Sequence, residues 1–300
     1  MSKKILVVGS TNTDMVIKTA HLPRPGETVL SGVFLMNAGG KGANQAVAAA
    51  RLGAQVTFVC KTGNDIFGQQ SKQLFADERI DAGYVFSDTE HPSGVALITV
   101  DAKAENCIAV ASGANAYLLP DDIKNASEAI EQSDIVLMQL EIPVETIEYV
   151  ANVANSKGKT VILNPAPAQA LSKSLLQCVN ILTPNETEAS MISGVTVTDT
   201  ATACEAARKI CAMGVQTVII TLGAKGALIY ADGFQKEIPA EKVEAVDTTA
   251  AGDVFNGALA VALAENKEIT DAALFACKAA SISVTRIGAQ ASAPYRKELL

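Results

Sequence analysis

The stretch DTTAAGDVFNGALA, residues 247–260, places a carboxylate at the start of a helix. Apolar residues recur at helical spacing from Phe255 to Leu263, and the first N–H groups of a helix lack intrahelical partners and attract anions. The small residues Ala251 and Gly252 would let a phosphoryl group reach those donors. Asp253 would then lie where it could take a proton from a substrate hydroxyl. Taken alone, Asp253 could equally be an acidic residue that stabilises a helix start.

Two further segments follow short apolar runs. TLGAKG, residues 221–226, is a tight glycine loop that suits close approach to nucleotide phosphates at the end of a strand. In TPNETEA, Asn185 and Glu188 are three residues apart and could face one hydrated metal ion at a helix start. An asparagine helix cap explains the second pair equally well.

A third group of polar residues lies near the N-terminus. GSTNTD presents Asn12 and Asp14, and GGKGAN presents Lys41 and Asn44, a set suited to bidentate hydrogen bonds with vicinal hydroxyls. Ordinary turn chemistry is the alternative. Lys41 is followed by glycine rather than Ser or Thr, which excludes a Walker A loop, and no G-x-G-x-x-G follows the first apolar run. A dinucleotide oxidoreductase is therefore disfavoured.

The elements that must position these residues alternate between short β-branched runs and helical patterns. This alternation predicts an α/β fold, a Rossmann-like three-layer α/β/α domain whose mostly parallel central sheet is covered by helices on both faces. The strands are expected at 5–8, 56–59, 135–140, 161–163, 179–182 and 218–222, and the helices within 39–53 and at 144–155, 201–213, 253–264 and 270–284.

Two regions, about 15–35 and 94–111, break this rhythm and predict a small β-sheet lid on a single domain spanning residues 1–300. VALITV, residues 95–100, forms a hairpin pattern with 107–110 and is apolar on both faces. Such a sheet cannot leave one face bare in water, so substrate or a second subunit should cover it. We expect a homodimer through the lid. The alternative is that these strands extend the edge of the main sheet.

Composition limits the partners. The net charge of -8 and pI near 4.9 argue against binding nucleic acid through its phosphates. No apolar run is long enough to cross a membrane, so no membrane partner is expected. The six cysteines are scattered without a CxxC pair, which indicates reduced thiols in a cytoplasmic protein.

Together these stretches resemble the ribokinase (PfkB-type carbohydrate kinase) family over residues 7–292. Its two long signatures correspond to GGKGANQAVAAARLG at 39–53 and DTTAAGDVFNGAL at 247–259. The finer pattern of GSTNTD, MQLEIP, NPAPA, TPNETEA and VTRIGAQAS is similar to the ribose-specific members rather than to adenosine kinases or phosphofructokinases.

The resemblance implies ATP-dependent transfer of the γ-phosphate to the 5-hydroxyl of D-ribose, giving D-ribose 5-phosphate. Asp253 would be the catalytic base, and the N–H groups of Ala250, Ala251 and Gly252 would form the anion hole. The sugar would be held by Asn12, Asp14, Gly40, Lys41, Gly42, Asn44, Glu141 and Asp253. ATP would contact Asn185, Thr221, Leu222, Gly223, Ala224, Lys225, Gly226, Gly252 and Asp253.

The resemblance also implies two metal ions. Asn185 and Glu188 would organise a hydrated Mg²⁺ that accompanies ATP. A monovalent cation, K⁺ in most such enzymes, would lie beside the anion hole at positions matching Asp247, Thr249, Ser283, Arg286, Gly288 and Ser292. Two positions depart from the pattern of many relatives: Ala250 replaces a glycine, and Cys277 replaces a polar neighbour of adenine.

Other functions remain open at this point. Another pentose, deoxyribose or a nucleoside could be the acceptor, although thirteen aromatics and no Trp offer little stacking surface for a nucleoside base. A non-catalytic sugar-binding regulator is a different class. Loss of the base would be its simplest sign, yet Asp253 and Gly252 are present.

Overall fold

The computed structural model describes residues 4–30, 32–103 and 105–299. Among these, nine strands form the central sheet, which is parallel except where β12 pairs with β11 and β13. The strand order is β13 (Phe234–Ile238), β12 (Ala227–Ala231), β11 (Thr217–Thr221), β10 (Ile181–Leu182), β9 (Thr160–Leu163), β8 (Ile135–Met138), β1 (Lys4–Val8), β4 (Gln55–Gly63) and β5 (Asp81–Asp88).

The inner strands of this sheet, such as β1, β8 and β9, are buried on both faces, which explains why they are continuous apolar runs. The edge strands β5 and β13 are at least partly exposed along most of their length and carry polar residues. Successive side chains point to opposite faces, so Ile5 and Val7 lie in one core while Leu6 and Val8 lie in the other. The first core packs against α1 (Lys41–Arg51), α2 (Ile66–Asp77), α9 (Ala251–Ala264) and α10 (Ile269–Ser283). The second packs against α3 (Pro120–Asn125), α4 (Ser127–Gln132), α5 (Val144–Ser156), α6 (Lys173–Gln177), α7 (Glu186–Ser193) and α8 (Thr200–Ala212).

The three-layer prediction is therefore confirmed, although β5, β12 and β13 were not among the expected strands. The six expected strands differ from the observed ones only at their ends. The strand expected at 135–140 ends at Met138, because the chain turns so that the Leu140 N–H donates to the Ala166 carbonyl. The strand expected at 179–182 begins at Ile181. Short 3₁₀ helices complete the main body: η1 (Gly113–Tyr117), η2 (Gly223–Lys225), η3 (Gln290–Ser292) and η4 (Arg296–Glu298).

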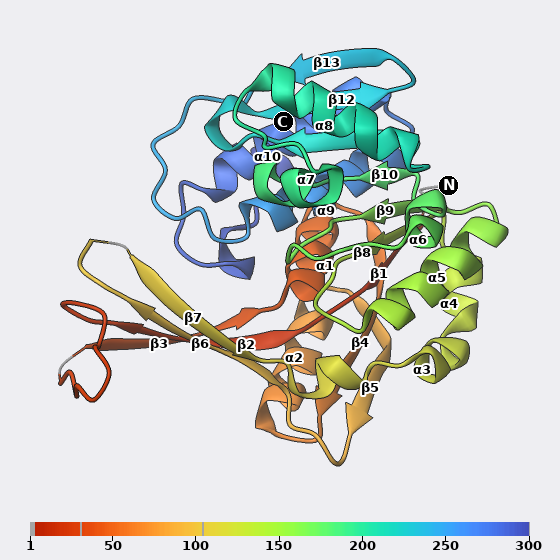
Figure 1. Ribbon diagram of the computed structural model, residues 1–300. Coiled ribbons are helices and arrows are strands. Elements are labelled where there is room, and N and C mark those ends of the chain that lie inside the picture. The colour runs from red at the N-terminus through yellow and green to blue at the C-terminus, as the bar shows by residue number, and fades with distance from the viewer. Residues whose placement is uncertain (1–3, 31, 104, 300) are drawn as a thin grey trace.

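A separate sheet, called here the small sheet, projects from the main body (Figure 1). Its order is β3 (Val33–Gly39), β2 (Asn12–Lys18), β6 (Gly94–Val100) and β7 (Asn106–Ala111). These strands pair only with one another among the described residues, so they do not extend the edge of the central sheet.

The strands of the small sheet occupy only part of the predicted ranges. After β2, residues 19–30 form a loop rather than short strands, since Pro23, Pro25 and Gly26 interrupt pairing there. Positions 31 and 104 of the predicted lid lie outside the described residues.

All six cysteines are free thiols in this structure. No helix among the described residues is both long enough and apolar enough to cross a bilayer.

Candidate active site

Asp253 lies in the first turn of α9, at the level where the parallel strands end. Its side chain is only 5 % exposed. Oδ2 accepts a hydrogen bond from Asn44 Nδ2 at 2.9 Å, and Oδ1 accepts one from Gln45 Nε2 at 2.9 Å. Both donors come from α1, which packs against α9, so helix packing brings the two sequence signatures together.

The start of α9 leaves backbone donors free. Ala250, the residue before the helix, has φ 60°, a left-handed conformation that turns the chain sharply into the helix. The Ala251 N–H already donates to the Thr248 carbonyl at 3.2 Å, so one donor expected in the anion hole is engaged in a turn. Within the described chain, the N–H groups of Gly252 and Asp253 have no protein acceptor.

Glu141 is fixed by the two segments that enter the small sheet and α1. Its Oε2 accepts hydrogen bonds from Ser10 Oγ at 2.6 Å and from the Lys41 N–H at 3.0 Å. Gly40 makes this approach possible, because its φ is 88° and a Cβ there would lie 2.7 Å from the Asn12 nitrogen. The carboxylate is thereby tied to the N-terminus of α1.

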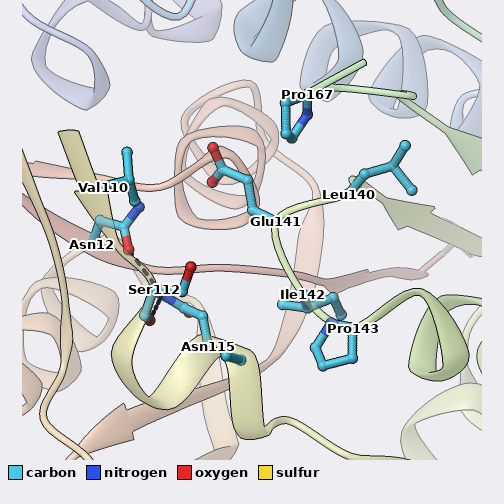
Figure 2. A pocket seen from close by; sticks show the side chains of 10 residues that line it. Asn12, Val110, Ser112, Asn115, Leu140, Glu141, Ile142, Pro143 and Pro167 are labelled. Carbon is cyan, nitrogen blue, oxygen red and sulfur yellow. Dashed lines mark hydrogen bonds between the residues drawn. The ribbon is translucent and has the colours of Figure 1, made fainter. Parts of the chain in front are cut away.

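Asn12 and Glu141 line a cavity of about 410 Å³ at the base of the small sheet. Figure 2 shows Asn12, Ser112 and Asn115 on one wall and the apolar side chains of Leu140, Ile142, Pro143 and Pro167 on the opposite wall. The buried Asn115 donates from Nδ2 to Asn12 Oδ1 at 2.8 Å, which orients the Asn12 amide. This volume, with polar groups facing an apolar wall, fits a small polyol such as a monosaccharide.

Four carboxylates, those of Asp14, Glu141, Glu188 and Asp253, surround one cation, Lys41. Burial raises the pKa of Asp14 to about 6, and the nearby Glu141 and Asp253 add to the shift. Burial also raises the pKa of Asp253, although Lys41 and the two amide donors oppose this. Burial lowers the pKa of Lys41, but Asp253 and Glu141 outweigh that effect, so its pKa is raised and it remains charged. Lys41 is thus the counter-ion of the site.

A second cavity of about 200 Å³ lies at the start of α9. Asn185 and Glu188 form a capping box there: the Glu188 N–H donates to Asn185 Oδ1 at 2.8 Å, and the Asn185 N–H donates to Glu188 Oε2 at 2.9 Å. Thr221 lies beside Asn185 as a parallel bridge partner. The cavity is lined by Lys41, Asn164, Ala166, Thr183, Asn185, Glu188, Thr221, Thr248, Ala250, Ala251, Gly252, Asp253 and Asn256.

The glycine loop after β11 is only partly at this cavity. Gly223, Ala224 and Lys225 are exposed and do not line it, whereas the Leu222 side chain is buried in the core. Gly226 has φ 99° and closes the loop by accepting a hydrogen bond from the Leu222 N–H at 2.8 Å. The exposed backbone of the turn is the part available to a ligand.

Of the six residues expected at a monovalent cation, Asp247 joins two others, Thr249 and Gly288. Its carboxylate accepts hydrogen bonds from Thr249 and from the Gly288 N–H at 2.9 Å, which together outweigh burial and lower its pKa. The Arg286 N–H donates to the Ser283 carbonyl, while the Arg286 guanidinium pairs with Glu298. None of the six expected residues lines either cavity. The described residues contain no cluster of three or more His, Cys, Asp or Glu side chains able to hold a metal ion.

Sequence reasoning missed a set of buried polar residues behind Asp253. Gln45, Gln139, Asn164 and Asn256 are each at most 7 % exposed. Gln139, Asn164 and Thr183 follow the strands β8, β9 and β10 directly. Polar residues at the carboxyl ends of consecutive parallel strands meet at one edge of a sheet, and this rule could have found them.

A parallel α/β sheet with a sugar-sized polar cavity, a helix start with free amides and a buried carboxylate between them defines a small-molecule phosphotransferase. Comparison with known proteins agrees. The model of the pfkB family of carbohydrate kinases matches residues 2–296. The chain belongs to this family, and it is a sugar kinase.

Individual relatives are similar over the whole length. The ribokinase of Haemophilus influenzae is 46 % identical over 300 residues, covering 100 % of this chain and 98 % of the relative. The deoxyribokinase of Salmonella typhi is 37 % identical, covering 97 % and 95 %. The structure of Arabidopsis thaliana ribokinase complexed with ribose and ATP has a TM-score of 0.91 at 34 % identity, covering 100 % and 98 %.

Proposed function

We propose that this protein is an ATP-dependent ribokinase that transfers the γ-phosphate of ATP to the 5-hydroxyl of D-ribose, giving D-ribose 5-phosphate and ADP. The observation that carries the proposal is the position of Asp253, a buried carboxylate beside the free N–H groups at the start of α9. The choice of ribose is supported by full-length relatives that are named ribokinases.

In this reaction Asp253 takes the proton of the sugar hydroxyl while the hydroxyl oxygen forms a bond to the γ-phosphorus. The bond from phosphorus to the ADP oxygen breaks on the far side. The N–H groups of Gly252 and Asp253, together with Lys41, stabilise the negative charge on the transferring group. Asn12, Asp14, Gly40, Lys41, Gly42, Asn44 and Glu141 would hold the sugar hydroxyls.

ATP would lie along the second cavity, with its phosphates toward α9 and its base toward the exposed turn of residues 223–225. The donor set there suits Mg²⁺, because Glu188 offers carboxylate oxygens, which this ion prefers. Burial raises the pKa of Glu188, and a nearby cation would favour its ionised form. Asn185 and Glu188 would hold the ion through water. When bound, Mg²⁺ neutralises phosphate charge during transfer.

A monovalent cation is proposed for the loop before α9. Asp247 already draws Thr249 and Gly288 together, and backbone carbonyls and hydroxyls of Ser283, Arg286 and Ser292 would complete an oxygen site. Such an ion would shape the loop that precedes the anion hole without touching the sugar. Activity should therefore rise when choline chloride is replaced by KCl at constant ionic strength, and equal rates in both salts would rule the site out.

The small sheet is proposed to act as a lid over the sugar and as the interface of a homodimer. Its outer side chains are apolar and exposed, including Phe34 at 59 %, Leu97 at 57 % and Met36 at 46 %. Leu97→Glu should then convert dimers to monomers in sedimentation experiments. Met191→Glu, at an equally exposed position on α7, is the matched control. A wild-type chain that sediments as a monomer would contradict the interface.

The decisive experiment is a coupled ADP-release assay with D-ribose, 2-deoxyribose, other pentoses and nucleosides. We expect the highest kcat/KM with D-ribose and no stimulation by NAD. Preference for 2-deoxyribose would instead favour the activity for which the Salmonella relative is named. Sugar binding without ADP release would indicate a non-catalytic regulator.

The free thiols are compatible with the proposed cytoplasmic location.

A further inference from the structure

Behind Asp253 lies a chain of buried amides that touches neither cavity for most of its length. Gln45 and Gln139 are each 0 % exposed. Gln45 Nε2 donates to Asp253 Oδ1 at 2.9 Å and to Asn164 Oδ1 at 3.1 Å, while Gln45 Oε1 accepts from Gln139 Nε2 at 2.7 Å. Gln45 is therefore held at both ends of its amide.

The ionised carboxylate of Asp253 sets the donor-to-acceptor direction of this series of buried amides. A carboxylate can only accept, so the nitrogen of Gln45 must face Asp253 and its oxygen must face Gln139, which in turn must present its own nitrogen. Asn164 fits the same direction, because its Nδ2 donates to the Thr183 carbonyl at 3.1 Å. Reversing the Gln45 amide would place its oxygen against the carboxylate and break these bonds.

The neighbouring donor Asn44 is held differently. Its Nδ2 donates to Asp253 Oδ2, but its buried Oδ1 has no hydrogen-bond partner among the described residues. A buried acceptor without a partner is costly unless a ligand supplies a donor. Asn44 thus keeps an acceptor that a sugar hydroxyl could fill, whereas both amide atoms of Gln45 are already bonded. The two oxygens of Asp253 consequently have different roles: Oδ1 is anchored and Oδ2 is the one available to substrate.

Asp253 needs such an anchor because its surroundings oppose ionisation. The charged groups that face it are Glu141 after β8, Asp14 on β2, Glu188 on α7 and Lys41 on α1, and only Lys41 is positive. Full burial favours the neutral acid, and a general base must be ionised to accept a proton. Neutral N–H donors stabilise the ionised form of Asp253 over its neutral acid. They do so without adding a second positive charge beside Asp253 that would also attract the phosphate.

We propose that Gln45 is a positioning residue for phosphoryl transfer: its amide, oriented by Gln139 and Asn164, anchors Oδ1 of Asp253 and leaves Oδ2 turned to the acceptor hydroxyl. This inference rests on the proposed kinase function. The hydroxyl proton passes to Oδ2 as the oxygen bonds to phosphorus and ADP leaves. Gln45 itself gains and loses no proton.

The test uses Gln45→Met, which keeps the side-chain length but removes the amide. We expect kcat to fall about 10- to 100-fold, the effect of losing a hydrogen bond to a charged group. The acid limb of the kcat profile should move to higher pH, because loss of the donor raises the pKa of Asp253. The KM for sugar should change by less than about threefold, since Gln45 does not line the sugar cavity.

Thr146→Val is the matched control. Thr146 is 0 % exposed in the opposite core, and its hydroxyl donates to the Leu118 carbonyl at 2.7 Å, so the variant also loses a buried hydrogen bond. It should lower Tm without moving the acid limb. If Gln45→Met lowers Tm in the same way and keeps both kcat and the acid limb of the wild type, Gln45 is structural and the inference is overturned.

A second variant covers failure of the first to fold. Gln45→Glu keeps the acceptor for Gln139 but places a carboxyl group against Asp253, so the two must share a proton. Its acid limb should move further upward than that of Gln45→Met, and an unshifted limb would also overturn the inference. Absence of sugar-dependent ADP release in the wild type would instead overturn the proposed function itself, which separates the two failures.

Discussion

Strands β8 and β6 are both apolar in sequence, but they occupy opposite environments. β8, with the sequence IVLM, has all four residues buried and Leu137 at 0 % exposure. β6, with the sequence GVALITV, lies in the small sheet, where Leu97 is 57 % exposed and every residue of the adjacent β7 is exposed. One sheet is covered by helices on both faces, and the other projects from the body (Figure 1).

This difference separates two tasks. The main body positions the reacting groups on elements that cannot move without opening a core, which suits groups that must hold fixed geometry. The small sheet is attached only where its strands meet the body, near Asn12 and Gly94. In the proposed roles as lid and dimer interface, the small sheet would move or pair without disturbing that core.

The largest effect is expected on the main-body side. Asp253→Asn removes the base while keeping the shape of the side chain, so kcat should fall about 10²- to 10⁴-fold. Binding of sugar, measured by calorimetry, should persist because the other polar groups of the cavity remain. Near-normal turnover would remove Asp253 as the base and would erase the functional distinction between the two regions.

Core truncation compares the two sheets directly. Leu137→Ala in β8 should lower the free energy of unfolding by about 2–5 kcal/mol, because it leaves a cavity that neighbouring groups cannot fill. Leu97→Ala in β6 should cost less than about 1 kcal/mol in the monomer, since most of its side chain faces solvent. Urea unfolding at several protein concentrations measures both. A loss for Leu97→Ala that grows with concentration would show that a partner covers it.

Asp14 tests the junction between the regions. Its folded pKa of about 6 exceeds the ordinary value of 3.8, so the folded state binds the extra proton between these pH values. The stability that this proton contributes is present at low pH and is lost as pH rises through about 6. Asp14→Asn should therefore raise the free energy of unfolding at pH 7 by about 1–3 kcal/mol while weakening sugar binding. Unchanged unfolding curves from pH 4 to 8 would contradict this.

The smallest effect is expected at Ala250. Glycine would adopt the left-handed conformation of Ala250 without steric cost, but it would lose more conformational entropy on folding than alanine does. Ala250→Gly should therefore change the free energy of unfolding by less than about 1 kcal/mol and leave kcat within about twofold. Gly40→Ala is the contrasting variant, because its new Cβ would lie 2.7 Å from the Asn12 nitrogen, and it should lose most sugar binding.

Local patterns predicted much of this molecule. The alternation of apolar runs predicted the layers, and the small residues before Phe255 predicted a helix start with an acid in its first turn, because helical periodicity and unpaired N–H groups are local properties. Local patterns could not predict that the Ala251 N–H is used by Thr248. That depends on the left-handed turn at Ala250, which the alanine itself does not favour.

The sequence by itself determined that its apolar runs become strands, that α9 begins near Ala251 and which residue types are available for phosphoryl transfer. Only the tertiary structure decided that Gln45, 208 residues from Asp253 along the chain, donates to one oxygen of that carboxylate. It also decided that the apolar strand β8 is fully covered while β6 leaves Leu97 exposed. The reason is physical: periodicity and capping act within a few residues, whereas hydrogen bonds across a core and the covering of a sheet depend on how distant segments pack.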